Sequence, residues 1–272
     1  MLKARLLSAA VMVPLVVAGV LYLPTDVFGL VLGLIIAAGL WEWSRLIPLH
    51  GMIARLAYVA IVLLLIGLLW WVQPETWLYP ILFSAVAWWL WSLYWVSRPQ
   101  IGVQATRFIN SLKMIAGVLV MVPAWAALVV LHGSDDRGPV FVLIVLVMIW
   151  LADSGAYFAG RQWGRTKLAP LVSPGKTREG VYGGLLASLV FAGVAGWFYS
   201  HSFKWTLAFM LVSLLAMMFS VVGDLLESLM KRQSGIKDSG SIIPGHGGIL
   251  DRIDSMVAAA PMFLVGLQWL KL

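Results

Sequence analysis

The stretch WTLAFMLVSLLAMMFSVVGDLLESLM, residues 205–230, decides the fold class of this chain. Residues 205–223 carry no charge, and roughly 20 consecutive apolar residues cross a bilayer as a helix. Because hydrocarbon offers the backbone no hydrogen-bond partners, such a segment must be helical. Eight further apolar blocks fill most of the chain, so we predict an all-α polytopic membrane protein.

We expect about nine transmembrane helices within one membrane domain, residues 1–272. Their approximate limits are 6–24, 27–47, 54–73, 77–97, 109–131, 139–160, 180–200, 205–230 and 255–272. Residues 1–138 are expected to supply scaffold or dimer contacts, and residues 139–272 the catalytic spans and loops.

The distribution of basic residues predicts the topology. When the N-terminus and every second connection are placed on one side, that side holds sixteen of the 19 Lys and Arg residues. The positive-inside rule then predicts a cytoplasmic N-terminus and a C-terminus outside. The two longest connections, 161–179 and 231–254, fall on the cytoplasmic side, where we expect the chemistry.

Composition narrows the functional classes. The chain has no cysteine, which excludes disulfides, thiolate metal sites and cysteine nucleophiles. A net charge of +7 accompanies 61% hydrophobic residues. We interpret this charge as basic loops that face anionic lipid, and we expect no nucleic-acid partner.

Carboxylates near the spans are candidate metal ligands. Asp224 and Glu227 are three residues apart and share a helical face. Asp251 and Asp254 repeat that spacing, and Asp153 lies in or near the sixth span. Intramembrane carboxylates are costly and are usually paired or functional. One interpretation is ion pairing with neighbouring basic residues; the other, which we favour, is a Mg²⁺ site built from hard oxygen ligands.

Two glycine-containing segments resemble nucleotide-binding loops without matching them. SPGKTREG (173–180) contains Gly-Lys-Thr, but Pro170 stands where a Walker A loop needs glycine. GHGG (245–248) lacks the spacing of a dinucleotide fingerprint. Glycines and nearby cations could instead admit a phosphate to the backbone. An ordinary turn and a structural His246 stay open as alternatives.

The segment SLMKRQSGIKDSGSIIPGHGGILDRID (228–254) resembles the signature of the CDP-diacylglycerol synthases, also called phosphatidate cytidylyltransferases. ADSGAYFAGRQWGRTKLAPLVSPGKTREG (152–180) and GDLLES (223–228) are similar to other segments of that family. Arg178 departs from the family pattern, where an aromatic or apolar residue is expected. Residues 1–140 match only in their pattern of spans.

The resemblance implies transfer of CMP from CTP to phosphatidic acid, with Mg²⁺ and room for a second cation such as K⁺. It also implies a homodimer in a bacterial inner membrane. Asp224 and Asp251 would bind metal. The expected catalytic residues are Lys237, Asp238, His246, Arg252 and Asp254. The expected substrate-binding residues are Asp153, Ser154, Lys176, Arg178, Ser228, Lys231, Arg232, Gly247 and Gly248.

Three other functions are weighed against this one. A CTP-dependent lipid kinase would transfer the γ-phosphate, but the complete 228–254 pattern favours the cytidylyltransferase. A CDP-alcohol phosphotransferase would need a D-x-x-D-G run, and Asp254 is followed by Ser255. A transporter would show repeated halves, whereas here the charged cluster lies in the C-terminal half alone.

Overall fold

The computed structural model describes residues 2–49, 51–242 and 247–270. Helices make up nearly all of the regular structure. They are α1 (Leu2–Tyr22), α2 (Thr25–Leu46), α3 (Met52–Trp71), α4 (Pro74–Ser97), α5 (Arg107–His132), α6 (Gly138–Trp163), α7 (Arg178–Ser200), α8 (Phe203–Gln233), α9 (Leu250–Ile253) and α10 (Met256–Trp269). A short antiparallel hairpin, β1 (Lys167–Ala169) and β2 (Ser173–Thr177), lies between α6 and α7.

Seven of the described helices, α2 to α8, are long and apolar enough to cross a membrane. The all-α polytopic prediction is therefore confirmed. The first and last expected spans, 6–24 and 255–272, correspond to α1 with 21 residues and to α10 with 14 residues. The hairpin was not expected, since the sequence suggested only a loop at 161–179.

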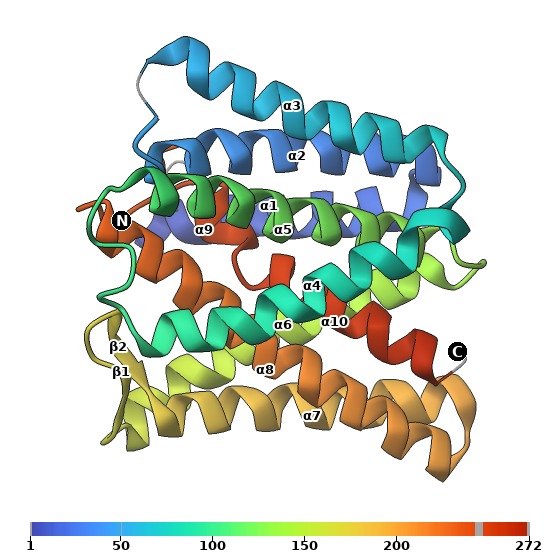
Figure 1. Ribbon diagram of the computed structural model, residues 1–272. Helices are drawn as coiled ribbons and strands as arrows, with labels where there is room; N and C mark the ends of the chain where they lie inside the picture. Colours follow the sequence, from blue (N-terminus) through green and yellow to red (C-terminus); the bar gives the residue numbers. More distant parts are fainter. Residues whose placement is uncertain (1, 50, 243–246, 271–272) are drawn as a thin grey trace.

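The bundle carries its long connections at one end. In Figure 1 the hairpin, α9 and the start of α1 lie at the left, and the C-terminus lies at the right. Successive long helices run back and forth between these two ends. This arrangement matches the predicted alternation, in which the N-terminus and the two longest connections share a side.

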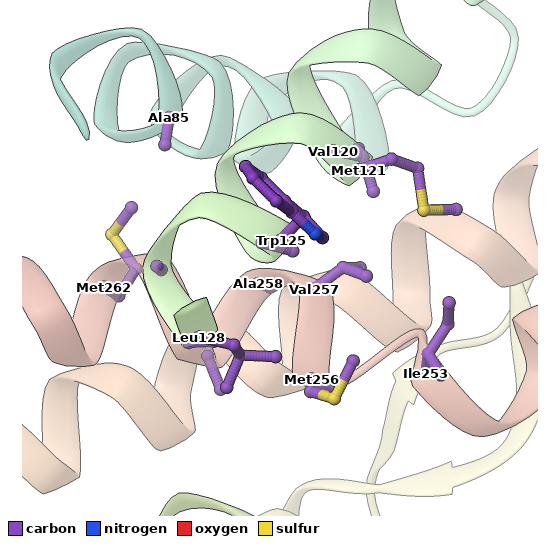
Figure 2. Packing of buried hydrophobic residues seen from close by; sticks show 14 of the residues in the cluster. Ala85, Val120, Met121, Trp125, Leu128, Ile253, Met256, Val257, Ala258 and Met262 are labelled. Atoms are coloured by element: carbon purple, nitrogen blue, oxygen red, sulfur yellow. The ribbon is translucent and has the colours of Figure 1, made fainter. Parts of the chain in front are cut away.

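The core forms where α10 packs between α5 and α8. Trp125 of α5 is 2% exposed, and it lies beside Met121, Val257 and Ala258 in Figure 2. Large apolar side chains on the outer helices are exposed instead; Leu68 and Phe83 are 64% and 77% exposed. An apolar exterior is what a lipid-facing surface requires.

Small residues bring α6 and α7 together. A Cβ on Gly184 would lie 2.5 Å from the Ala152 carbonyl oxygen, and one on Gly155 would lie 2.8 Å from the Gly183 carbonyl oxygen. Glycine and alanine at such contacts let membrane helices approach closely. The close contact fixes the hairpin, which joins these two helices, beside the end of α8.

Candidate active site

Carboxylates from four parts of the chain line one polar cavity of about 310 Å³. Asp153 comes from α6, Asp224 from α8, and Asp251 from α9. The remaining lining residues are Lys231, Asp238, Arg252, Asp254 and Ser255. The three acids that the sequence placed far apart are thus neighbours in space, at the end of the bundle that carries the hairpin.

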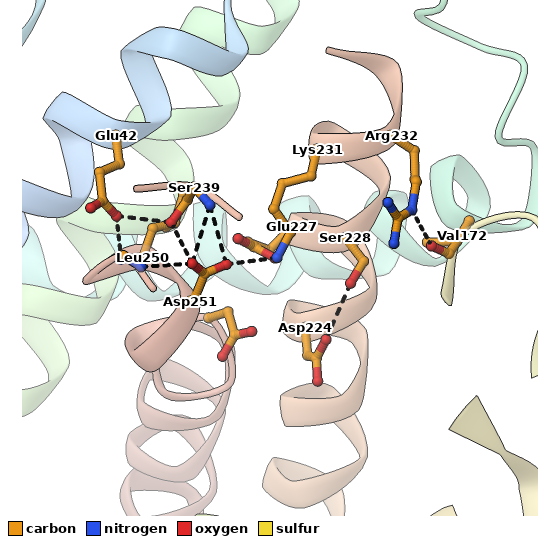
Figure 3. Close-up of polar contacts among 12 residues, drawn as sticks. Glu42, Val172, Asp224, Glu227, Ser228, Lys231, Arg232, Ser239, Leu250 and Asp251 are labelled. Atoms are coloured by element: carbon orange, nitrogen blue, oxygen red, sulfur yellow. Dashed lines mark hydrogen bonds and ion pairs between the residues drawn. The ribbon is translucent and has the colours of Figure 1, made fainter. Parts of the chain in front are cut away.

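Lys231 joins two of the acidic segments. Its Nζ lies 2.5 Å from Glu227 Oε2, one helical turn away, and 2.7 Å from Asp251 Oδ1. The side chains of Lys231, Glu227 and Asp251 are only 12%, 3% and 8% exposed. Opposite charges buried this far from water hold one another in place, so α8 and α9 are linked through Lys231 (Figure 3).

Asp251 also organises the loop that precedes it. Its Oδ2 accepts hydrogen bonds from Gly248 N at 2.8 Å, Ser239 N at 3.1 Å and Ser239 Oγ at 3.0 Å. Burial alone would raise the pKa of Asp251, but the Lys231 ammonium and the Gly248 N–H bind its charged form and hold the pKa at about 2. Gly247 adopts φ +86°, a conformation that favours glycine.

The hairpin reaches the same cavity through Lys176. Its Nζ forms an ion pair with Asp224 Oδ2, and Ser228 Oγ lies 3.4 Å from Asp224 Oδ1. Lys176 sits on β2, next to Thr177, whose Oγ1 accepts the Gly180 N–H and caps α7. The capped junction between β2 and α7 therefore places the Lys176 ammonium group next to Asp224 on α8.

Acidic side chains outnumber basic ones around the cavity. Five carboxylates line it against Lys231 and Arg252, with Lys176 paired at its edge. Burial, followed by the negative charges of Asp224 and Asp153, raises the pKa of Asp254 well above its usual range. A hard cation would relieve this repulsion, and an all-oxygen donor set suits Mg²⁺.

The donor atoms are not grouped as a closed metal cage. Among the described residues, no three His, Asp or Glu side chains are close enough to form one. Both Asp251 oxygens already accept hydrogen bonds, whereas the polar contacts of Asp224 within the described chain are with Lys176 and Ser228. Mg²⁺ commonly keeps several waters and takes one or two carboxylates plus substrate phosphates, so the residues fit an open site of that kind.

An apolar groove adjoins the polar cavity. Its volume is about 420 Å³, and it shares Asp153, Asp224 and Ser255 with the cavity. The rest of its wall comes from α6, α7, α8 and β2, including Tyr157 and Leu185. Gly160, Gly180 and Gly184 also line it, so part of its wall carries no side chain. A molecule with an apolar tail and a charged head could thus lie across both.

The structure does not bring every predicted residue into the cavity. Within the described part of the chain, the lining does not include Ser154, Arg178 or Lys237. Arg232 points elsewhere: its Nε donates to the Val172 carbonyl at 3.3 Å and joins α8 to the hairpin turn (Figure 3). His246 lies outside the described residues.

The sequence did not indicate Ser255 and Arg161, which line the cavity or the groove, nor Glu42 and Ser239, which support the loop before Asp251. Glu42 of α2 is fully buried and accepts hydrogen bonds from Ser239 Oγ and Leu250 N. Ser239 is 2% exposed. The only available signal for Glu42 was an acid at the end of an apolar span, and such residues commonly lie at the membrane interface.

Comparison with known proteins identifies the family to which the chain is similar. The sequence pattern of the cytidylyltransferase family matches residues 3–270. A Pseudomonas aeruginosa protein named phosphatidate cytidylyltransferase is 40% identical over 271 residues, 99% of this chain and 97% of its own length. A Haemophilus influenzae protein of the same name is 37% identical, with 97% of each chain covered. One from Staphylococcus epidermidis is 44% identical over 132 residues, 48% of this chain and 50% of its own.

Proposed function

Since the chain belongs to the cytidylyltransferase family, we propose that it transfers CMP from CTP to phosphatidic acid. The products are CDP-diacylglycerol and pyrophosphate, and the enzyme is integral to the membrane. One observation carries the assignment: the polar cavity and the apolar groove share Asp153, Asp224 and Ser255. A water-soluble nucleotide and a membrane lipid can meet there.

The reaction is a direct in-line displacement. A phosphate oxygen of phosphatidic acid forms a bond to the α-phosphorus of CTP, and the bond to the bridging α–β oxygen breaks. Pyrophosphate leaves with that oxygen and its electron pair. A phosphomonoester has a second pKa of about 6, so the attacking group is already largely ionised at neutral pH and needs no strong base.

The side chains of the site supply positioning and charge. Both substrates are polyanions, and such transfers are accelerated mainly by alignment and by neutralisation of phosphate charge. Lys231 and Arg252 line the cavity, and Lys176 and Arg161 line the adjoining groove. Lys176 and Lys231 are held in place by Asp224 and Asp251, so their ammonium groups are already positioned when the substrates bind.

Mg²⁺ is proposed as the cofactor, with Asp224 and Asp251 as its ligands and Asp153 and Asp254 facing the same space. When bound, it would neutralise the triphosphate and the leaving pyrophosphate. The excess of carboxylates leaves room for a second cation such as K⁺. For Asp251 to bind the metal, a bond to the ion would have to replace one of its hydrogen bonds, such as that from Lys231.

The remaining predicted roles are part of the same proposal. Asp238 faces the cavity, and Lys237 and His246 belong to the same connection, so they are proposed to contact the triphosphate. Arg178, at the start of α7, is proposed to meet the lipid phosphate near the groove. We place the site on the cytoplasmic face of a bacterial inner membrane because of the sixteen basic residues on that side. A homodimer is retained from the family resemblance.

The test uses purified enzyme in detergent with Mg²⁺, phosphatidic acid and CTP labelled at either the α- or the γ-phosphate. Label from the α-position is expected in the lipid, with release of pyrophosphate. Asp224→Asn and Asp251→Asn should lower this rate at least 100-fold. The matched control Asp136→Asn changes an exposed acid in the turn after α5 and should leave it unchanged. Entry of the γ-label would indicate a lipid kinase and contradict the proposal.

A further inference from the structure

Glu42 is a fully buried carboxylate that binds the loop before Asp251. Its Oε2 accepts a hydrogen bond from Leu250 N at 2.8 Å and another from Ser239 Oγ at 2.9 Å. The partners lie 208 and 197 residues away along the chain. Burial of a carboxylate costs several kcal/mol unless its oxygens are paired, so a glutamate here needs more than a packing role to explain it.

The loop is shaped around the Glu42 carboxyl group. A Cβ on Gly240 would collide with Glu42 Oε1, and one on Gly248 would collide with both Glu42 Oε2 and Ser239 Oγ. Glycine is therefore favoured at positions 240 and 248 for steric reasons, whether or not a phosphate binds nearby. Glu42 Oε1 itself has no hydrogen-bond partner among the described residues.

Both partners of Glu42 lead directly to Asp251. Leu250 is the residue before it, and Ser239 meets Asp251 Oδ2 through its backbone N–H at 3.1 Å and its hydroxyl at 3.0 Å. Figure 3 shows this chain of contacts from α2 to α9. A second tie lies nearby, where Ser234 Oγ donates to the Leu46 carbonyl at 2.9 Å. The end of α2 thus fixes both ends of the segment that carries Asp238.

We propose that Glu42 is a positioning residue for the transfer reaction. It holds Ser239 and the Leu250 amide, and through them it sets the orientation of the Asp251 carboxylate in the cavity. Glu42 does not line the cavity itself, so it acts without touching substrate. The inference rests on the proposed function in one respect, the assignment of Asp251 to the active site.

The loss expected on removing Glu42 follows from geometry. A displacement of about 1 Å in a catalytic group can cost on the order of 100-fold in rate. Glu42→Leu fills the space with no acceptor, which leaves the buried Leu250 N–H unpaired and frees the Ser239 hydroxyl to bond to Asp251 alone. Glu42→Gln retains an oxygen that can accept both hydrogen bonds. We therefore expect kcat/KM for CTP to fall roughly 100-fold in Glu42→Leu and by less than about 10-fold in Glu42→Gln.

The experiment compares these variants with Ser44→Ala as the matched control. Ser44 is equally buried on α2, and among the residues that the structure describes its hydroxyl bonds to the Trp41 carbonyl of the same helix alone. The quantities measured for each purified protein are kcat, KM for CTP, KM for phosphatidic acid and Tm. A raised KM for CTP at an unchanged KM for phosphatidic acid supports the inference, because a general loss of folded protein would move neither. Recovery in Glu42→Gln is the expected accompanying result.

Three outcomes decide the matter. If Glu42→Leu lowers Tm while the folded enzyme keeps the wild-type KM and kcat, the residue is structural and the inference is overturned. If Glu42→Leu does not fold, Ser239→Ala takes its place; a wild-type KM for CTP there overturns the inference, and a raised one supports it. Asp251→Asn separates the two proposals, since full activity in that variant would refute the site and not the contacts of Glu42.

Discussion

Replacement of Lys231 by methionine tests whether the buried charge cluster stabilises the fold. Lys231 Nζ is shared by Glu227 and Asp251 at 2.5 and 2.7 Å. The Glu227 oxygens receive no hydrogen bond from the described residues, so this ion pair is their main compensation. Lys231→Met keeps an unbranched side chain of similar length but removes the charge and the N–H donors, which leaves two carboxylates with less than 10% exposure and without their cation.

The expected cost is large. Removal of one partner from a buried ion pair destabilises by roughly 3–5 kcal/mol, because the remaining charge is uncompensated. In a chain of this size each kcal/mol corresponds to a few degrees, so Tm should fall on the order of 10 °C. The measurement is a thermal unfolding curve of the purified protein in detergent, followed by intrinsic tryptophan fluorescence.

Two further variants make the result interpretable. Lys204→Met removes a charge from an exposed position on the same helix and should change stability by less than about 0.5 kcal/mol. Adding Glu227→Gln to Lys231→Met should restore part of the loss, because one of the two uncompensated carboxylates is gone. The reasoning is refuted if Lys231→Met is as stable as Lys204→Met, or if the double variant is less stable than the single one.

Three other predictions follow from the same loops. The pKa of Asp251 is held at about 2, below its value in the unfolded chain. The contribution of Asp251 to stability is therefore complete above about pH 4 and is lost as pH falls towards 2. Thermal unfolding between pH 2 and 5 should show this contribution in wild type, and Asp251→Asn should lack it. Gly248→Ala places a methyl group against the Ser239 hydroxyl and should cost roughly 1–3 kcal/mol, measured by chemical unfolding; an unchanged midpoint would contradict the steric argument. Arg232→Ala removes the hydrogen bond to the Val172 carbonyl and should speed amide hydrogen exchange across residues 167–177 while Tm changes little; unchanged exchange would show that the hairpin does not depend on this contact.

Hydropathy was sufficient to predict the long helices because the backbone of a segment within the membrane must form its own hydrogen bonds, as a helix does. The expected span 54–73 corresponds to α3 at Met52–Trp71, and 180–200 to α7 at Arg178–Ser200. The last expected span, 255–272, corresponds to α10 at Met256–Trp269. The short helix α9, at Leu250–Ile253 within the connection that precedes it, was not expected.

The charged part of the site was predictable where charge and spacing lie close together in the sequence. Asp224, Lys231 and Asp251 fall within 28 residues, on two elements joined by one connection. Their meeting needs only that α8 and α9 be neighbours. Lys176 required one more step, that the loop before α7 folds back over α8, and the predicted topology already placed both connections on one side.

Glu42 was not predictable by the same route, since the sequence does not state which early helix lies beside the last loop. That neighbour is α2, and its C-terminal end provides both the Glu42 carboxylate and the Leu46 carbonyl to residues 234–250. The connection between α4 and α5 adds a third anchor, where Gln233 Nε2 donates to the Ile101 carbonyl at 2.7 Å. The N-terminal half, expected to be scaffold or dimer contacts, therefore holds the connection that carries Asp251 at three points. Substitutions at these anchors should change KM for CTP although the anchors do not contact the nucleotide. The geometry of the cavity is therefore set by both halves of the chain.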